Sequence, residues 1–258
     1  MSGIRAALES DAGSATSLRF MPDELTRIRD LIRAQWLARI WQMAPRVAPE
    51  FEAIEMDRYH EQAHLIDHKA AWPKIERILD DEAVAAIRDM SVFRRLEKEF
   101  GTFSISNEEE WRREEIYWRL VRPNNTDDVG PLHADEWFWN LGHGKMPPGH
   151  RRIKVWIAVY CERGKSGFRF VPGSHRRNWR YHGEQRDGFI KPQIDEPEEE
   201  LEVRIFESDP GQLIVFHDRM LHGGAVGGAR TRVSLEFTML VNEEHYLHGP
   251  RQFLFGHA

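Results

Sequence analysis

The order of hydrophobic and polar positions divides the chain into a helical first part and a second part made of strands. After Pro22-Asp23-Glu24, which is typical of a helix start, large apolar residues recur three or four positions apart as far as Trp41. From Glu115 onward the dominant period is two, which is the period of a strand with one buried face. Further helices are expected at residues 51–69, 74–90 and 91–100.

The second part predicts a series of short strands. In residues 232–241 every second residue from Val233 to Met239 is apolar, and polar side chains occupy the opposite face. Short strands joined by turns, helices in front of them and no alternation of strand and helix indicate a mainly β protein with N-terminal helices, whose strands form a double-sheet jelly roll. The other expected strands are residues 115–121, 153–160, 167–171, 203–206 and 212–216.

The length of the chain suits a single domain. A chain of 258 residues can bury one sizeable core, and mixed or all-β domains of this size are commonly single. Residues 1–20 are rich in small residues and are expected to be loosely ordered, and residues 21–258 are expected to form one domain. Its expected parts are a mostly helical region at 21–110, a jelly-roll core at 115–241 and a C-terminal extension at 242–258.

Composition and charge narrow the class of protein. A hydrophobic content of 41% with 30% charged residues is that of a soluble globular protein, and a net charge of −6 gives no case for nucleic-acid binding. The single cysteine, Cys161, rules out a disulfide within the chain and fits a reducing compartment. No signal-peptide core and no run of about 18 apolar residues occurs, so we expect a cytoplasmic protein without a transmembrane segment. Peripheral membrane contact and the oligomeric state stay open.

Three residues have the types and spacing of a metal site. His133 and Asp135 are two positions apart, so in an extended segment both side chains would lie on one face. His222 follows the strand expected at 212–216 and precedes Gly223-Gly224. Two histidines and one carboxylate on one face of an ion leave other coordination positions open, which is typical of non-haem Fe(II) oxygenases. His-x-Asp alone is weak evidence, because surface loops often contain it.

Arg232 and Ser234 suggest a binding site for a carboxylate beside that metal. A planar guanidinium can bind a carboxylate through two parallel hydrogen bonds, and the Ser234 hydroxyl on the same strand face can add a third. Arg230 competes for this role, but it is expected in the preceding turn, facing solvent.

Taken together, these motifs resemble a known group. His133-Ala134-Asp135, His222 and Arg232-Val233-Ser234 resemble the Fe(II)/2-oxoglutarate-dependent oxygenase superfamily. Residues 167–175 and 208–217 narrow the resemblance to its phytanoyl-CoA dioxygenase-like branch, over roughly residues 115–241.

The resemblance implies a double-stranded β-helix in which Fe(II) is held by His133, Asp135 and His222. It implies 2-oxoglutarate chelating that iron, with its far carboxylate at Arg232 and Ser234, and O2 as the second cosubstrate. Related halogenases lack the carboxylate ligand, so the presence of Asp135 predicts hydroxylation of an unactivated C–H bond.

Other residues are candidates for the lining of the pocket, and some of them could instead be packing residues of the core. Lys154 and Trp156 are expected to face the interior as cofactor-binding residues, and a buried Lys154 would need an anionic partner, either cosubstrate or substrate. Trp137 and Trp139 would line the pocket or pack in the core.

The remaining candidates are weaker and lie elsewhere in the chain. The stripe His60, His64 and His68 would line the mouth of the site or bind a metal, or be the polar face of a surface helix. The basic cluster at 175–180 would attract an anionic substrate or be a solvated loop. Lesser candidates are Arg122 as a partner for an anion, His143 as a lid element and His217 as a supporting or packing residue.

The substrate is the least determined part of the hypothesis. Cations and tryptophans near the expected mouth fit a small anionic molecule, such as a sugar acid or a glycolipid sugar, although an acyl-CoA or a modified amino acid is nearly as compatible. A cupin-like metalloenzyme that does not use 2-oxoglutarate is an alternative, and it would have no use for Arg232 and Ser234. A non-catalytic carbohydrate-binding jelly roll is another, and it would gain nothing from open metal positions.

Overall fold

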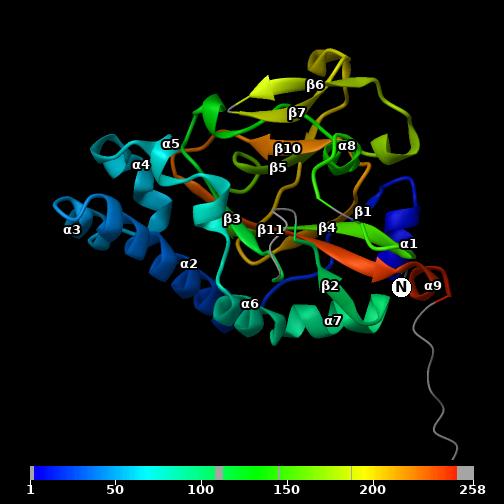
Figure 1. Ribbon diagram of the computed structural model, residues 1–258, viewed down its shortest axis with the longest axis horizontal. Helices are drawn as coiled ribbons and strands as arrows, with labels where there is room; N and C mark the ends of the chain where they lie inside the picture. The colour runs from blue at the N-terminus through cyan, green and yellow to red at the C-terminus, as the bar shows by residue number, and fades with distance from the viewer. Residues whose placement is uncertain (1–2, 108–112, 145, 187, 249–258) are drawn as a thin grey trace, which may run out of the picture.

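Two antiparallel sheets form the body of the protein (Figure 1). The computed structural model describes residues 3–107, 113–144, 146–186 and 188–248. In the larger sheet the strand order is β1-β9-β4-β11-β2, and β3 also pairs with β11. Its strands are β1 (Ser14–Ala15), β9 (Leu213–His217), β4 (His150–Tyr160), β11 (Arg232–Asn242), β2 (Phe103–Ile105) and β3 (Tyr117–Val121).

The smaller sheet covers one face of the larger one. It has the order β10-β5-β8, and a separate bridge pairs His133 with His222 at its edge. Aromatic and aliphatic side chains from both sheets, including Trp156, Phe168 and Phe216, form a core between them. The strands of this sheet are β10 (His222–Ala225), β5 (Gly167–Phe170) and β8 (Arg204–Ile205).

Helices cover the other face of the larger sheet. Ile28, Ile32 and Trp36 of α2 are fully buried in a core shared with that sheet, whereas Trp41 near the helix end is 42% exposed. The expected helix at residues 91–100 is present with those bounds as α7, and Gly101 follows it with a φ of +77°, which suits glycine. The principal helices are α2 (Pro22–Met43), α6 (Asp81–Arg88) and α7 (Ser91–Phe100).

The alternation predicted for residues 232–241 is present in β11. Val233, Leu235 and Phe237 belong to the core beneath the helices, while Arg232 and Ser234 face the second sheet and are also buried. Both faces of β11 are buried because the helices cover one and the smaller sheet covers the other, while β4, β2 and β3 pair with its edges. The polar residues of this strand therefore lie inside the protein, where they must find partners.

The prediction of one continuous helix at residues 51–69 is wrong. Short 3-10 turns interrupt the stretch, and near its end Asp67 accepts hydrogen bonds from the backbone of Lys69 and Ala70 and so begins a new helix. His60, His64 and His68 consequently do not share one helix face. The segments are α3 (Ala48–Glu52), η1 (Met56–Arg58), α4 (Tyr59–Gln62), η2 (Ala63–Leu65) and α5 (His68–Ala71).

The helix expected at residues 74–90 is also divided. Residues Lys74–Arg77 form a single 3-10 turn, η3, and α6 begins only after Asp80, whose side chain accepts from the backbone of Ala83. Between them the Leu79 N–H donates to Ile116 O, so the chain is extended there instead of helical.

The N-terminal segment differs from the loosely ordered one that its composition suggests. Residues 4–20 contain α1 (Ile4–Glu9) and β1, and β1 pairs with β9 at the edge of the larger sheet. Leu8, Leu18 and Phe20 are buried there. The burial of these few apolar side chains holds the segment on the domain, although most of its residues are small.

Several elements were not expected from the sequence. A hairpin of β6 (Tyr181–Arg186) and β7 (Phe189–Ile194) follows the basic cluster, and α8 (Asp135–Asn140) begins directly at Asp135. At the C-terminal end α9 (Glu243–His248) packs back on the domain, where Tyr246 stacks on Phe100. The aromatic residues of the expected C-terminal extension beyond residue 248 lie outside the described residues. Short 3-10 turns are η4 (Thr126–Asp128), η5 (Ser174–Arg176) and η6 (Glu198–Glu200).

Within the described parts of the chain, no helix has both the length and the apolar character needed to cross a membrane.

Candidate active site

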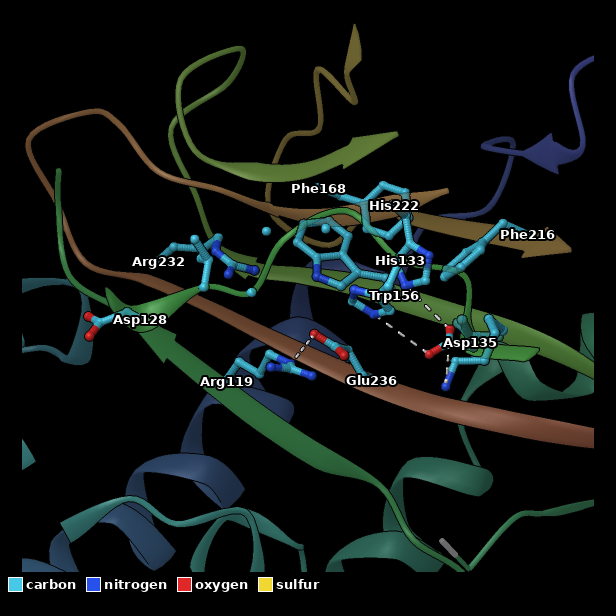
Figure 2. A pocket seen from close by; sticks show the side chains of 16 residues that line it. Arg119, Asp128, His133, Asp135, Trp156, Phe168, Phe216, His222, Arg232 and Glu236 are labelled. Carbon is cyan, nitrogen blue, oxygen red and sulfur yellow. Dashed lines mark ion pairs between the residues drawn. The ribbon is translucent and has the colours of Figure 1, made fainter. Parts of the chain in front are cut away.

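His133, Asp135 and His222 come together at one end of the space between the sheets (Figure 2). One ligand atom from each lies within 4.8 Å of the other two. His133 Nε2 is 4.0 Å from Asp135 Oδ1, and His222 Nε2 is 3.3 Å from Asp135 Oδ2. Residues that are 87 to 89 positions apart in the sequence thus form one compact donor set.

Backbone hydrogen bonds orient both imidazole rings. The Nδ1 of His133 lies 3.0 Å from Pro131 O, and the Nδ1 of His222 lies 2.9 Å from Met220 O. A carbonyl oxygen can only accept, so each Nδ1 carries the proton and each Nε2 keeps its lone pair. Reciprocal backbone bonds of 3.0 and 2.9 Å between His133 and His222 fix the distance between the two rings.

The position of Asp135 differs from the simple strand geometry expected for His-x-Asp. His133 is in an isolated bridge, whereas Asp135 is the first residue of α8, and the buried Trp137 anchors that helix. The carboxylate therefore reaches the histidines from the start of a helix, where the helix dipole favours negative charge.

The chemistry of this donor set fits Fe(II). Burial, with a smaller contribution from the neighbouring His222, lowers the pKa of His133 to about 4, so this ring is neutral at pH 7 and can donate an electron pair. Two neutral imidazoles and a hard carboxylate suit a borderline divalent ion. Asp135 Oδ2 is also buried without a hydrogen bond in the described part of the chain, although Lys154 Nζ lies 3.5 Å away as an ion-pair partner.

Arg232 occupies the opposite end of the same pocket (Figure 2). Arg232 is 1% exposed, and its terminal nitrogen donates to Ser234 Oγ at 3.0 Å. Its Nε is buried and has no hydrogen-bond partner among the described residues. Burial lowers the pKa of Arg232 to about 10, which leaves it charged at pH 7. Arg230, in contrast, points outward and pairs with Asp57.

Lys154 and Trp156 also line the pocket, from β4. Lys154 is 3% exposed and donates to Thr238 Oγ1 at 2.7 Å. Its ion pair with Asp135 gives this buried lysine an anionic partner within the chain. The Trp156 ring lies 6.0 Å from the Arg232 guanidinium, so it forms the apolar wall between the two ends.

Sequence reasoning missed a second ion pair in the pocket wall. Arg119 Nε lies 2.9 Å from Glu236 Oε1, and Tyr117 OH donates to Glu236 Oε2 at 2.9 Å. Burial alone would raise the pKa of Glu236, but Arg119 and Arg232 lower it to about 2. The only sequence signal was strand alternation, which placed Glu236 on the same face as Arg232.

The other aromatic candidates and Arg122 lie outside the pocket. Trp137 stacks on Tyr181 in a separate small core, and Trp139 lies under the Arg152 guanidinium. Arg122 is bound to Asp128.

His143 and His217 also have partners away from the pocket lining. His143 Nε2 contacts Ile190 O in the β6–β7 hairpin, and His217 Nδ1 is 3.1 Å from Asp218 Oδ1. In the basic cluster His175 is buried, while Arg176 pairs with Asp11 of the N-terminal segment. His60 and His68 contact residues next to the pocket, as described below.

Comparison with solved structures identifies the fold. A non-haem monooxygenase, ThoJ in its apo form, matches with a TM-score of 0.50 and 15% identity over 90% of this chain and 75% of that one. EctD from S. alaskensis, solved with 2-oxoglutarate and 5-hydroxyectoine, matches with a TM-score of 0.50 and 15% identity over 92% and 74% of the chains. The structure of EctD with bound Fe gives 14% identity, 92% and 75% coverage and the same TM-score. No curated protein matches the sequence significantly.

These matches confirm the double-stranded β-helix, and a roll of this kind with a two-histidine, one-carboxylate site defines the class of non-haem iron oxygenases. The profile of the phytanoyl-CoA dioxygenase family matches residues 17–231. The chain belongs to that family, as its motifs indicated. It is a 2-oxoglutarate-dependent dioxygenase whose cofactors are Fe(II) and 2-oxoglutarate, and it acts with O2 on a small molecule.

Proposed function

We propose that this dioxygenase hydroxylates an unactivated C–H bond of a small anionic substrate, with Fe(II) held by His133, Asp135 and His222. The convergence of these three ligand atoms within 4.8 Å of one another is the observation that carries the proposal. Bound Fe(II), together with 2-oxoglutarate and O2, would supply the oxidising power for inserting oxygen into the bond. The carboxylate ligand at position 135 favours hydroxylation over halogenation.

In this proposal the two histidines contribute fixed Nε2 donors. Their Nδ1 protons are held by Pro131 O and Met220 O, so neither ring can rotate without losing a hydrogen bond. Such outer contacts keep ligands in place when a metal dissociates or changes its other ligands. Lys154 keeps the Asp135 carboxylate at the start of α8.

Arg232 and Ser234 would bind the far carboxylate of 2-oxoglutarate. The buried Nε of Arg232 needs an acceptor, and an anion at this end would supply it while also offsetting the buried positive charge. Trp156 and Phe168 would shield the chain of the cosubstrate from water. Arg119 is held by Glu236 close to the same wall and adds positive charge to it.

The substrate proposal rests on charge. Arg119 lines the pocket and remains partly exposed, although it is paired with Glu236. A substrate with a carboxylate or another acidic group would complement this cation. A sugar acid, or the acidic sugar of a glycolipid, is a class of small molecule with this chemistry.

Two further parts of the proposal concern the whole chain. We infer that the chain acts as one domain that includes residues 4–20, and that the enzyme works in the cytoplasm, where a free thiol such as Cys161 stays reduced. Cys161 is itself partly buried beside Ser208, and burial raises the pKa of its thiol, which fits packing rather than reactivity.

An anaerobic titration tests the cofactor assignment. Fe(II) and 2-oxoglutarate added to the wild-type protein should produce a visible metal-to-ligand charge-transfer band. His222→Ala should abolish the band, and Arg232→Ala should require much more 2-oxoglutarate to reach it. Arg163→Ala, which removes an exposed arginine outside the pocket lining, is the control and should leave the titration unchanged.

Absence of the band in wild-type protein that demonstrably binds iron would remove 2-oxoglutarate from the proposal. A cupin-like metalloenzyme would then be the better explanation. Once the band is established, release of succinate in the presence of trial anionic substrates would identify the substrate class.

A further inference from the structure

Residues 56–68 contact both walls of the pocket end that contains Arg232. This segment, which we call the bracing segment, comprises η1, α4, η2 and the first residue of α5. It carries His60, His64 and His68, the histidine stripe of the sequence. Two of these histidines contact residues beside the pocket, and His64 is exposed to solvent.

On one side the bracing segment holds the start of β11. The N–H of Thr231 donates to Asp57 O at 2.8 Å. The backbone N–H of His60 donates to Thr231 Oγ1 at 3.0 Å, and the ring Nδ1 of His60 lies 3.0 Å from the same oxygen. Thr231 is 1% exposed and directly precedes Arg232, so these contacts fix the backbone from which Arg232 projects.

On the other side the bracing segment holds the loop at residues 126–130. His68 Nε2 lies 3.5 Å from Asp128 Oδ1, and the Asp128 side chain is only 2% exposed. Arg122 donates to the same carboxylate from its backbone at 2.8 Å and from its guanidinium at 2.9 and 2.6 Å. Asp128, Val129 and Gly130 line the pocket, so His68 supports the loop that forms one of its walls.

The position of His68 is in turn set by the core. Its Nδ1 lies 2.9 Å from Tyr59 OH, and Trp72 Nε1 donates to that hydroxyl at 3.2 Å. Tyr59 is fully buried. With Tyr59 OH donating to Nδ1, the proton of a neutral His68 is on Nε2 and points toward Asp128.

The two walls meet beside Gly224 of β10. A Cβ at this position would lie 2.7 Å from Val129 Cγ1 and 3.0 Å from a terminal nitrogen of Arg232. Val129 and Arg232 are therefore in close contact with the same small residue from different directions. The width of this pocket end depends on where loop 126–130 and the start of β11 are held.

We propose that the bracing segment is a positioning element that sets the fit of the pocket to the far carboxylate of 2-oxoglutarate, with His68 and Asp128 holding one wall and His60 and Thr231 the other. This inference rests on the proposed role of Arg232. It adds residues that contact neither metal nor cosubstrate and act through Asp128 and Arg232. It also implies selectivity, because a fixed wall favours a dicarboxylate of one length.

Two ligands distinguish effects at the metal end of the pocket from effects at the Arg232 end. 2-Oxoglutarate has both the chelating atoms and a far carboxylate, whereas oxalate has only the chelating atoms. Binding of each to the Co(II)-loaded protein, which is stable in air, can be followed by calorimetry and by the visible spectrum of the cobalt. Thermal unfolding of each variant shows whether the fold is retained.

His68→Leu should raise the Kd of 2-oxoglutarate about tenfold, because loop 126–130 loses the contact of His68 with Asp128, and should leave the Kd of oxalate within about twofold. A tenfold change corresponds to about 1.4 kcal/mol. His68→Gln, whose amide can still donate to Asp128, should restore most of the affinity. Tyr59→Phe should act in the same direction more weakly and serves as the second variant should His68→Leu fail to fold. His64→Leu is the matched control and should change neither Kd.

Equal weakening of both probes by His68→Leu would overturn the inference, because the effect would then not be confined to the Arg232 end. An unchanged Kd for 2-oxoglutarate would also overturn it. Arg232→Ala is the reference that keeps the two proposals apart. If Arg232→Ala leaves the Kd of 2-oxoglutarate unchanged, the proposed function is contradicted. If Arg232→Ala raises this Kd and His68→Leu does not, only the proposed role of the bracing segment is contradicted.

Discussion

The ammonium group of Lys154 lies 3.5 Å from Oδ2 of Asp135, the carboxylate of the metal-binding set. From the sequence, a buried Lys154 is expected to need an anionic partner, either cosubstrate or substrate. In the structure Lys154 pairs with the Asp135 carboxylate and also donates to Thr238 Oγ1 at 2.7 Å. Lys154 therefore lies at the end of the pocket that contains the metal-binding residues, and Arg232 lies at the opposite end.

This relationship predicts an effect on metal affinity. A unit positive charge beside the site repels an incoming divalent ion, so Lys154→Met should bind Ni(II) severalfold more tightly than the wild-type protein. Competition with a chelator of known affinity measures this. Lys154→Arg retains the charge and should stay close to wild type. Weaker Ni(II) binding by Lys154→Met would show that ordering of Asp135 outweighs the repulsion, contrary to the prediction.

Gly224 should be intolerant of even one added methyl group. The Cβ of Gly224→Ala would clash with Val129 Cγ1 and press on Arg232, so we expect a rise in the Kd of 2-oxoglutarate of roughly tenfold with little change in Ni(II) affinity. Isothermal titration of both ligands checks this. Gly223→Ala, whose Cβ would lie 3.3 Å from the movable Arg169 side chain, is the neighbouring control. A similar loss in the two variants would count against a specific effect on Arg232.

The ion pair of Arg119 and Glu236 predicts a pH dependence of stability. Because the pKa of Glu236 is lowered to about 2 from an ordinary value near 4.5, the folded state favours the ionised form. Its contribution is present above pH 4.5 and is lost as the pH falls toward 2, with a total of roughly 3 kcal/mol. Urea unfolding of the metal-free protein at pH 7 and pH 3 should show Glu236→Gln less stable at pH 7, with a smaller difference at pH 3. A difference of equal size at both values would contradict the assignment.

The N-terminal segment should contribute to stability as a part of the core. Leu8 is 1% exposed, so Leu8→Ala should lower the free energy of unfolding by about 2–5 kcal/mol. Met21 is 56% exposed, and Met21→Ala should change it by less than about 0.5 kcal/mol. Urea unfolding monitored by tryptophan fluorescence measures both. If Leu8→Ala proves as harmless as Met21→Ala, the segment contributes nothing measurable to the core.

The sequence by itself determined those features that depend on neighbours along the chain. The period of residues 232–241 was enough to place Arg232 and Ser234 on one face and Val233 on the other, and the start of α2 was visible in its first acidic turn. His133, Asp135 and His222 were identifiable because a metal site restricts both residue types and spacing. In each case the deciding physics is local or is tied to a short motif.

Only the tertiary structure decided the features that depend on packing between distant segments. The pairing of β3 with β11 brings Arg119 to Glu236, residues 117 positions apart, and no local pattern specifies that register. The contact of His68 with Asp128 required the expected helix at 51–69 to break, which capping at Asp67 and burial around Tyr59 brought about. Side chains buried by such packing must find partners inside the protein, and the partners available there set their roles.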